Sequence, residues 1–194
     1  MALITGNNNS NFLIGTNSDD WILGYGGSDD IEGNDGNDLI YGGTGGDIIN
    51  GDSGNDLIFG NDGNDFLFGN VGDDLINGGL GNDQINGFGG GQEYDTLTGG
   101  GGVNEFILGN FSQRYYSGSG YATITDFNWI FDTLIVPANI NIDDYTIDTA
   151  NLSGGTAVDT RIRYGSDWIA VLEDVNLTNI NPSSYLEQAL APVP

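Results

Sequence analysis

The chain has 194 residues, of which 34 are Gly and 28 are acidic, and its formal net charge at pH 7 is -25. Its basic residues are Arg114, Arg161 and Arg163, and it contains no Lys, His or Cys. These absences exclude disulfide frameworks, zinc sites built from His and Cys, and catalysis by Ser-His or Cys-His pairs. The charge argues against nucleic acid and anionic membranes, which proteins bind through Lys and Arg. We therefore expect a chain that is not an enzyme, does not insert into membranes, and takes cations as partners.

Residues 6 to 106 are organised as a repeat of nine residues that begins with Gly. The fourth position is Gly from the third block onward, and a tenth block with three extra residues and an eleventh with Asn104 follow the nine regular blocks. After Asn11 in the first block, the sixth position of the regular blocks is Asp20, Asp29, Asp38, Asp47, Asp56, Asp65, Asp74 and Asp83. The eighth position is apolar throughout, as Leu13, Ile22, Ile31, Ile40, Ile49, Ile58, Leu67, Ile76, Ile85, Leu97 and Phe106.

Each block divides into a turn and a short strand. Gly at the first and fourth positions tolerates positive φ in a tight turn, and the last three residues alternate outward, inward, outward. Two blocks make one coil of 18 residues, so stacked coils bring the eighth-position side chains into one interior file. The predicted fold class is therefore all-β, a right-handed parallel β-roll of two facing parallel sheets followed by a small β-rich C-terminal capping region.

Stacking places the sixth-position aspartates of alternate blocks in two ladders. Neighbouring carboxylates then lie about 4.8 Å apart and repel one another by roughly 3 kcal/mol at an effective dielectric constant near 20. A bound countercharge resolves this repulsion, and the alternative is a solvated acidic edge without ions. Carboxylate oxygens and backbone carbonyls freed by Gly turns suit Ca²⁺ better than Mg²⁺ or softer metals. We therefore expect calcium.

The blocks GNDGNDLIY (residues 33–41) and GNDGNDFLF (residues 60–68) resemble the RTX, or haemolysin-type, calcium-binding nonapeptide. The resemblance implies a parallel β-roll in which the second and fourth carbonyls of one loop, the first and third of the loop two blocks later, and both aspartates bind Ca²⁺. Carried to this sequence, the ligand sets are Tyr25, Gly27 and Asp29 with Gly42, Thr44 and Asp47; Gly43, Gly45 and Asp47 with Gly60, Asp62 and Asp65; Asn61, Gly63 and Asp65 with Gly78, Leu80 and Asp83; Asn34, Gly36 and Asp38 with Gly51, Ser53 and Asp56; and Asp52, Gly54 and Asp56 with Gly69, Val71 and Asp74. Gly72 is a further candidate, and Asp20 adds a weaker sixth site, giving five or six ions in all.

Gly becomes sparse after residue 109, where we expect the calcium-binding roll (1–109) to give way to a β-rich cap (110–194). The segment 121–137 is similar to the capping sequence that follows the repeats in many RTX proteins. Alternating apolar residues in 160–164 and 168–172 predict a β-hairpin, and 182–190 a short helix. The resemblance also implies an uncleaved C-terminal export signal, although the tail at 191–194 lacks the acidic residue followed by apolar ones that some such signals carry.

The outward positions of alternate blocks form a continuous apolar row, Trp21, Leu39, Tyr41, Leu57, Phe59 and Leu75. A patch of this size usually marks a covered or interacting surface. One interpretation is that the C-terminal segment folds over it, and the other is a homodimer or a protein partner.

Three functional classes remain open. The favoured class is a non-enzymatic calcium-binding protein, extracellular or at the cell surface, where calcium is high enough for modules of modest affinity. Ice or surface binding is a second class, but the third loop positions do not repeat Thr. An accessory module of an exported enzyme or adhesin is the third, although the repeats begin close to Met1 and leave little room for a catalytic domain.

Overall fold

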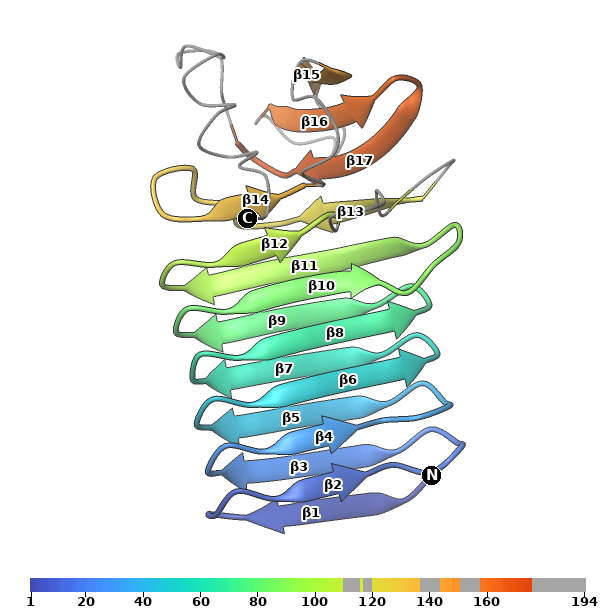
Figure 1. The fold of residues 1–194 in the computed structure, drawn as a ribbon, viewed down its shortest axis with the longest axis vertical. Coiled ribbons are helices and arrows are strands. Elements are labelled where there is room, and N and C mark those ends of the chain that lie inside the picture. Colours follow the sequence, from blue (N-terminus) through green and yellow to red (C-terminus); the bar gives the residue numbers. More distant parts are fainter. Residues whose placement is uncertain (110–115, 117–119, 137–143, 151–157, 176–194) are drawn as a thin grey trace.

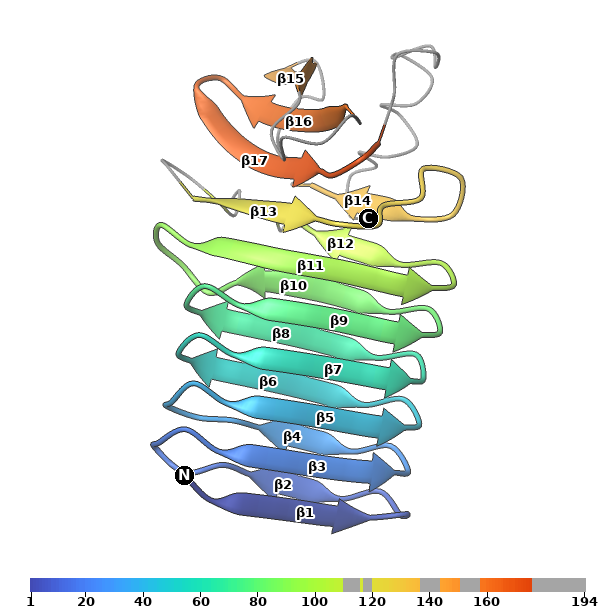
Figure 2. The same cartoon turned by 180° about the vertical axis from the view of Figure 1, so that it is seen from behind.

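The computed structural model describes residues 1–109, 116, 120–136, 144–150 and 158–175. The chain winds between two sheets that are stacked as coils along the long axis of the molecule (Figures 1 and 2). The ten-stranded sheet, called sheet A, contains in spatial order β1 (Leu3–Asn7), β3 (Trp21–Gly26), β5 (Leu39–Thr44), β7 (Leu57–Asp62), β9 (Leu75–Leu80), β11 (Tyr94–Gly101), β13 (Tyr121–Ile124), β17 (Asp167–Leu172), β16 (Asp159–Tyr164) and β15 (Tyr145–Ala150). The seven-stranded sheet, called sheet B, contains β14 (Thr133–Ile135), β12 (Glu105–Ile107), β10 (Gln84–Phe88), β8 (Phe66–Val71), β6 (Ile48–Ser53), β4 (Asp30–Glu32) and β2 (Phe12–Ile14).

All strand pairs from β1 to β14 are parallel, which confirms the predicted β-roll. Equivalent residues of successive coils pair with each other, so that Leu39 of β5 is the register partner of Leu57 of β7. The three extra residues of the tenth block shift this register, because Leu75 of β9 pairs with Thr96 of β11. The expected coil of 18 residues therefore holds up to β10, and the insertion is absorbed in the loop that joins β10 to β11.

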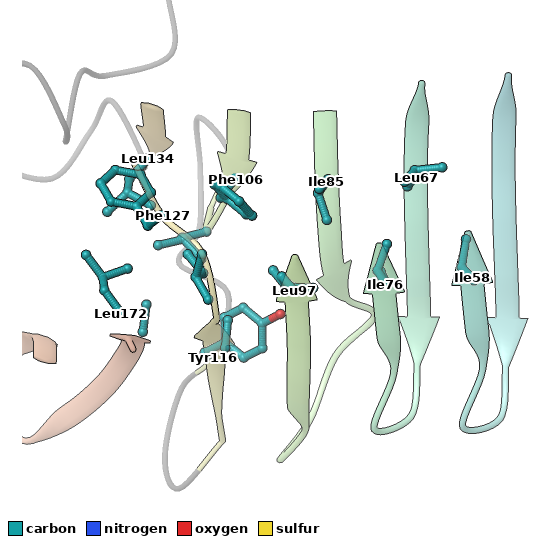
Figure 3. Packing of buried hydrophobic residues seen from close by; sticks show 14 of the residues in the cluster. Ile58, Leu67, Ile76, Ile85, Leu97, Phe106, Tyr116, Phe127, Leu134 and Leu172 are labelled. Carbon is teal, nitrogen blue, oxygen red and sulfur yellow. The ribbon is translucent and has the colours of Figure 1, made fainter. Parts of the chain in front are cut away.

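The eighth-position side chains form the predicted interior file between the two sheets. Ten of the eleven have no exposed surface, and Leu13 at the N-terminal end is 8% exposed. Figure 3 shows the file from Ile58 to Phe106, with Tyr116, Phe127, Leu134 and Leu172 continuing the packing beyond the repeats. Each coil adds only two of these side chains, one from each sheet, so the interior is thin and the fold depends on what holds the loops at its two edges.

Beyond the repeats, the described strands extend both sheets. β13 pairs in parallel with β11 and β17, and β16 and β17 form the antiparallel hairpin that the alternating pattern predicted. Arg161 donates to the Asp148 carboxylate across β15 and β16 and lies 5.1 Å from the ring centroid of Trp168. The predicted helix at 182–190 and the C-terminal tail lie outside the described residues. The division at residues 109 and 110 stays a prediction.

The apolar row lies on the outward face of sheet A. The register places Trp21, Leu39, Leu57 and Leu75 beside one another on successive strands, and Tyr41 stacks on Phe59 with 4.8 Å between ring centroids. Trp21 is 51% exposed and Leu75 is 45% exposed. The described C-terminal strands lengthen sheet A and do not fold over this row. In the described part of the chain, no helix is long and apolar enough to cross a bilayer.

Candidate calcium centres in the stacked loops

The loops at the two edges of the roll have an alternating backbone. Positive φ occurs at the second position, as in Asn34 (70°) and Asn61 (72°), and at the fourth, as in Gly45 (129°). The expectation of positive φ at the first position is wrong, because none of these glycines has it. The first glycine is required by close approach instead: a β-carbon on Gly42 would lie 2.4 Å from Asp47 Oδ2 and 2.9 Å from the Gly60 carbonyl oxygen.

Both aspartate ladders are present, and they are buried. The eight predicted aspartates are between 0% and 2% exposed, so the alternative of a solvated acidic edge is wrong. One carboxylate oxygen of each rung accepts the backbone N–H of the preceding rung 18 residues earlier, as in Asp38 N–H to Asp56 Oδ1 at 2.8 Å. The same bond joins Asp29 to Asp47 at 2.8 Å and Asp65 to Asp83 at 2.9 Å. This second, structural use of the carboxylate was not foreseen from the sequence.

The other carboxylate oxygen has no hydrogen-bond partner in most rungs. Among the described residues, this buried, unpartnered Oδ2 is found in Asp29, Asp38, Asp47, Asp56, Asp65, Asp74 and Asp83. A buried charged oxygen without a partner is strongly destabilising unless a cation compensates it. Stacked neighbours therefore form five pairs of free oxygens, namely Asp29 with Asp47, Asp47 with Asp65, Asp65 with Asp83, Asp38 with Asp56, and Asp56 with Asp74.

Backbone carbonyls face the same spaces between successive loops. The carbonyl oxygens of Tyr25 and Gly27 lie 2.1 Å and 2.0 Å from where β-carbons on Gly43 and Gly45 would be. From the loop below, the Gly42 carbonyl oxygen lies 2.2 Å from the position of a β-carbon on Gly24. Third-position carbonyls also point to the preceding loop on the same edge, since Gly45 N–H donates to the Asp62 carbonyl at 2.8 Å. Several carbonyl oxygens that the resemblance assigned as ligands therefore lie where successive loops meet, and the full ligand sets stay a prediction.

This donor set fits a hard divalent cation. Among the described residues, no three acidic side chains converge on one point, so each space offers two carboxylates and relies on backbone carbonyls for further oxygens. Ca²⁺ takes six to eight oxygen ligands in flexible geometry, and carbonyls are among its usual ligands. No imidazole or thiolate exists in the chain to attract a softer metal.

Burial makes the charged form of the ladder aspartates costly. It is the main reason why the pKa of Asp56 is raised to about 6, that of Asp65 to about 7 and that of Asp74 to about 8, and the negative charges of neighbouring carboxylates act in the same direction. A cation placed between two such carboxylates favours their charged form and so opposes both effects.

The rungs at the ends of the ladders differ from those in the middle. Thr16 donates its backbone N–H and its hydroxyl to Asp20 Oδ2 at 2.6 Å and 2.7 Å, and the bond from the Thr16 backbone is the main cause that lowers the pKa of Asp20. Asn128 N–H donates to Asp132 Oδ2 at 2.8 Å in the same way. Unlike the middle rungs, these two aspartates have no unpartnered oxygen.

Two functional candidates near the ladder rung of Asp95 were missed from the sequence. The buried Tyr116 hydroxyl donates to Asp95 Oδ2, and Glu93 is only 4% exposed. Glu93 lies in the loop that the three extra residues lengthen, and Tyr116 lies after the last block, so neither is marked by the period of nine.

The fold and the loops together define a parallel β-solenoid whose edges are lined with oxygen donors for divalent cations. Residues 5–90 match the family model of the RTX calcium-binding nonapeptide repeat in four overlapping copies, at 5–40, 24–58, 41–76 and 59–90. This stretch of the chain consists of RTX calcium-binding nonapeptide repeats.

Two solved structures are similar to the chain at low sequence identity. The extracellular lipase LipA from Serratia marcescens has 18% identity and a TM-score of 0.43, over 93% of this chain and 39% of the lipase chain. The AlgE6R3 subunit of the mannuronan C5-epimerase from Azotobacter vinelandii has 19% identity and a TM-score of 0.30, over 92% of this chain and 78% of that one. The chain thus spans well under half of the lipase. No curated protein sequence matches the chain.

Proposed function

We propose that the chain is a non-enzymatic calcium-binding protein whose roll folds when five calcium ions bind between its stacked loops. The observation that carries the proposal is the set of five stacked aspartate pairs whose buried second oxygens have no partner. Ca²⁺ would supply the positive charge that these carboxylates lack. The ligands proposed for each ion are the two aspartates of a pair with the second and fourth carbonyls of the upper loop and the first and third of the lower loop.

The ladder bonds prepare these sites without closing them. Because the N–H of the preceding rung holds only Oδ1, each carboxylate in the stacked coils keeps Oδ2 for the ion, and Oδ2 points into its own loop beside the first glycine. Two carboxylates per ion are few for a calcium site, which suits modest affinity and the high calcium concentration outside cells. We infer on this basis that the protein acts outside the cell or at its surface. The C-terminal export signal concerns residues outside the described part of the chain and stays a prediction.

A calcium titration of calcium-stripped protein, followed by far-ultraviolet circular dichroism and light scattering, tests the proposal. We expect a cooperative gain of β signal with calcium and none with magnesium at the same concentration. Stripped protein that is already fully folded at neutral pH, and that calcium does not change, would show that the loops do not need the ion.

The apolar row on sheet A supports a second proposed property, association of two copies through this face. Leu57 lies in the middle of the row, between Leu39 and Leu75 on the neighbouring strands. Replacing Leu57 with Asp is expected to give a monomer that still binds calcium. The control is Gln84→Asp on sheet B. Light scattering that finds the same mass for the wild type and Leu57→Asp would contradict association through this face.

A further inference from the structure

The loop that joins β8 to β9 provides one half of a calcium site. The next loop along the same edge, which should provide the other half, is not a regular repeat loop. Asn70 (φ 67°) and Gly72 (φ 138°) have the alternating backbone of the other loops, and Asp74 Oδ2 is buried without a partner. The loop below, between β10 and β11, contains the three inserted residues. Its ladder aspartate is Asp95, whose Oδ1 accepts the backbone N–H of Asp74 at 2.9 Å. The two residues are 21 positions apart, compared with 18 in the regular rungs.

Asp95 does not offer a free oxygen to this half-site. Its Oδ2 accepts the hydroxyl of Tyr116, which has no exposed surface. Figure 3 shows Tyr116 beside Leu97 of β11, with its hydroxyl oxygen turned towards that strand. The ladder position of this rung therefore lacks the second free carboxylate oxygen that every regular pair has.

Glu93 supplies a carboxylate in the same loop. It is 4% exposed, its Oε2 accepts the backbone N–H groups of Gly89 and Gly90 at 3.1 Å and 3.2 Å, and its Oε1 is buried without a partner. Gly89 touches the loop above, since a β-carbon on it would lie 2.3 Å from the Asn70 carbonyl oxygen. Glu93 is also one of the charged groups that act on Asp74, together with Asp56 and Asp95.

We propose that this rung binds a sixth calcium ion, in a site outside the nonapeptide pattern that uses Asp74 and Glu93 as its carboxylate ligands. The site has two buried, unpartnered carboxylate oxygens, as each regular pair has, and one of them comes from the lengthened loop. The proposal rests on the proposed function, because the upper half of the site is a repeat loop. Tyr116 acts as a positioning residue that turns Asp95 away from the ion.

The equivalent rung on the opposite edge offers no carboxylate. Asn104 stands where Asp is expected, and its Oδ1 accepts Asp83 N–H at 3.0 Å. The remaining buried atom of Asn104 is the amide nitrogen, a donor that does not bind cations. The pair of Asp83 and Asn104 has only one free carboxylate oxygen, Asp83 Oδ2. We therefore expect the row of ions on this edge to end at the pair of Asp65 and Asp83.

Counting bound calcium in the full chain by equilibrium dialysis tests the sixth site. The variants are Glu93→Gln, which keeps an oxygen to accept the Gly89 and Gly90 N–H groups, and the control Glu105→Gln on β12. Asp20→Asn controls for an ion at the N-terminal end of the ladder. We expect six ions in the wild type, Glu105→Gln and Asp20→Asn, and five in Glu93→Gln.

Each outcome decides the proposal. Five ions in the wild type, or six in a folded Glu93→Gln, would overturn the sixth site and leave the five regular sites standing. No binding in any form would overturn the proposed function as well. If Glu93→Gln does not fold in calcium, six ions in both the wild type and Asp20→Asn would support a site beyond the regular pairs.

Discussion

Asp56→Asn is expected to have opposite effects with and without calcium. Asp56 belongs to two of the five pairs, with Asp38 before it and Asp74 after it. The substitution removes one negative charge and keeps the Oδ1 that accepts the Asp38 N–H. Asn104 already performs this ladder role in the native chain. The variant therefore separates the charge of the carboxylate from its hydrogen bond.

The two magnitudes follow from burial and from ion binding. Raising the pKa of Asp56 from 3.8 to about 6 corresponds to about 3 kcal/mol of destabilisation above pH 6. The buried amide nitrogen of Asn costs about 1–3 kcal/mol, so without calcium the variant gains between 0 and about 2 kcal/mol. With calcium it weakens two sites, each of which contributes about 2.7 kcal/mol at a free concentration 100 times the dissociation constant. If both contributions are lost, the net loss with calcium, after the calcium-free gain is subtracted, is about 3–5 kcal/mol.

Refolding measured by circular dichroism gives both numbers. Trimethylamine N-oxide is an osmolyte that favours compact states. The concentration of it at which half of the protein refolds, in chelator at neutral pH, therefore reports the calcium-free stability. Asp56→Asn should refold at the same or lower osmolyte concentration than the wild type, and should need more calcium to fold without osmolyte. The exposed Asp30→Asn is the matched control for net charge. A variant that is destabilised in chelator, or that folds at the wild-type calcium concentration, would refute the assignment of Asp56 to two ions.

Three further predictions follow from the same geometry. The calcium-stripped roll should be most stable in acid and should lose β signal as the pH rises from about 4 to 8. The reason is that the ladder aspartates keep their protons in the folded state up to pKa values of about 6 to 8, whereas the unfolded chain loses them near 3.8. A flat pH profile of the dichroism signal would contradict this. Ile58→Ala should cost about 2–5 kcal/mol in urea unfolding with calcium, since Ile58 is fully buried, and a cost below 1 kcal/mol would mean that the file does not carry the fold. Gly81→Ala should abolish the wild-type calcium response, since its β-carbon would lie 1.4 Å from the Gly63 carbonyl oxygen. The control Gly165→Ala, whose β-carbon would meet nothing within 4 Å, should cost only about 1 kcal/mol for its positive φ. Equal effects of the two substitutions would show that the loops tolerate a side chain.

The regular part of the molecule was predictable because one nine-residue pattern carries several independent constraints. The apolar eighth position gave the interior file, and the stacked sixth position gave the two ladders. The bonding of each carboxylate was not predictable, because it depends on which backbone N–H points at Oδ1 once the coils are stacked. The Tyr116 contact with Asp95 spans 21 residues and follows no period, so only the folded structure shows it.

The sharing of Asp47, Asp56 and Asp65 between neighbouring pairs makes the two edges of the roll resemble one-dimensional lattices. An ion that binds to one pair fixes a carboxylate that also belongs to the next, so occupancy should spread from nearest neighbour to nearest neighbour, as stability does in other linear repeat proteins. The interior file links the two lattices, because each coil contributes to both edges. Adding or deleting whole coils would then change the steepness of the calcium response more than its midpoint, and the number of repeats becomes the property that sets how sharply the protein responds to calcium.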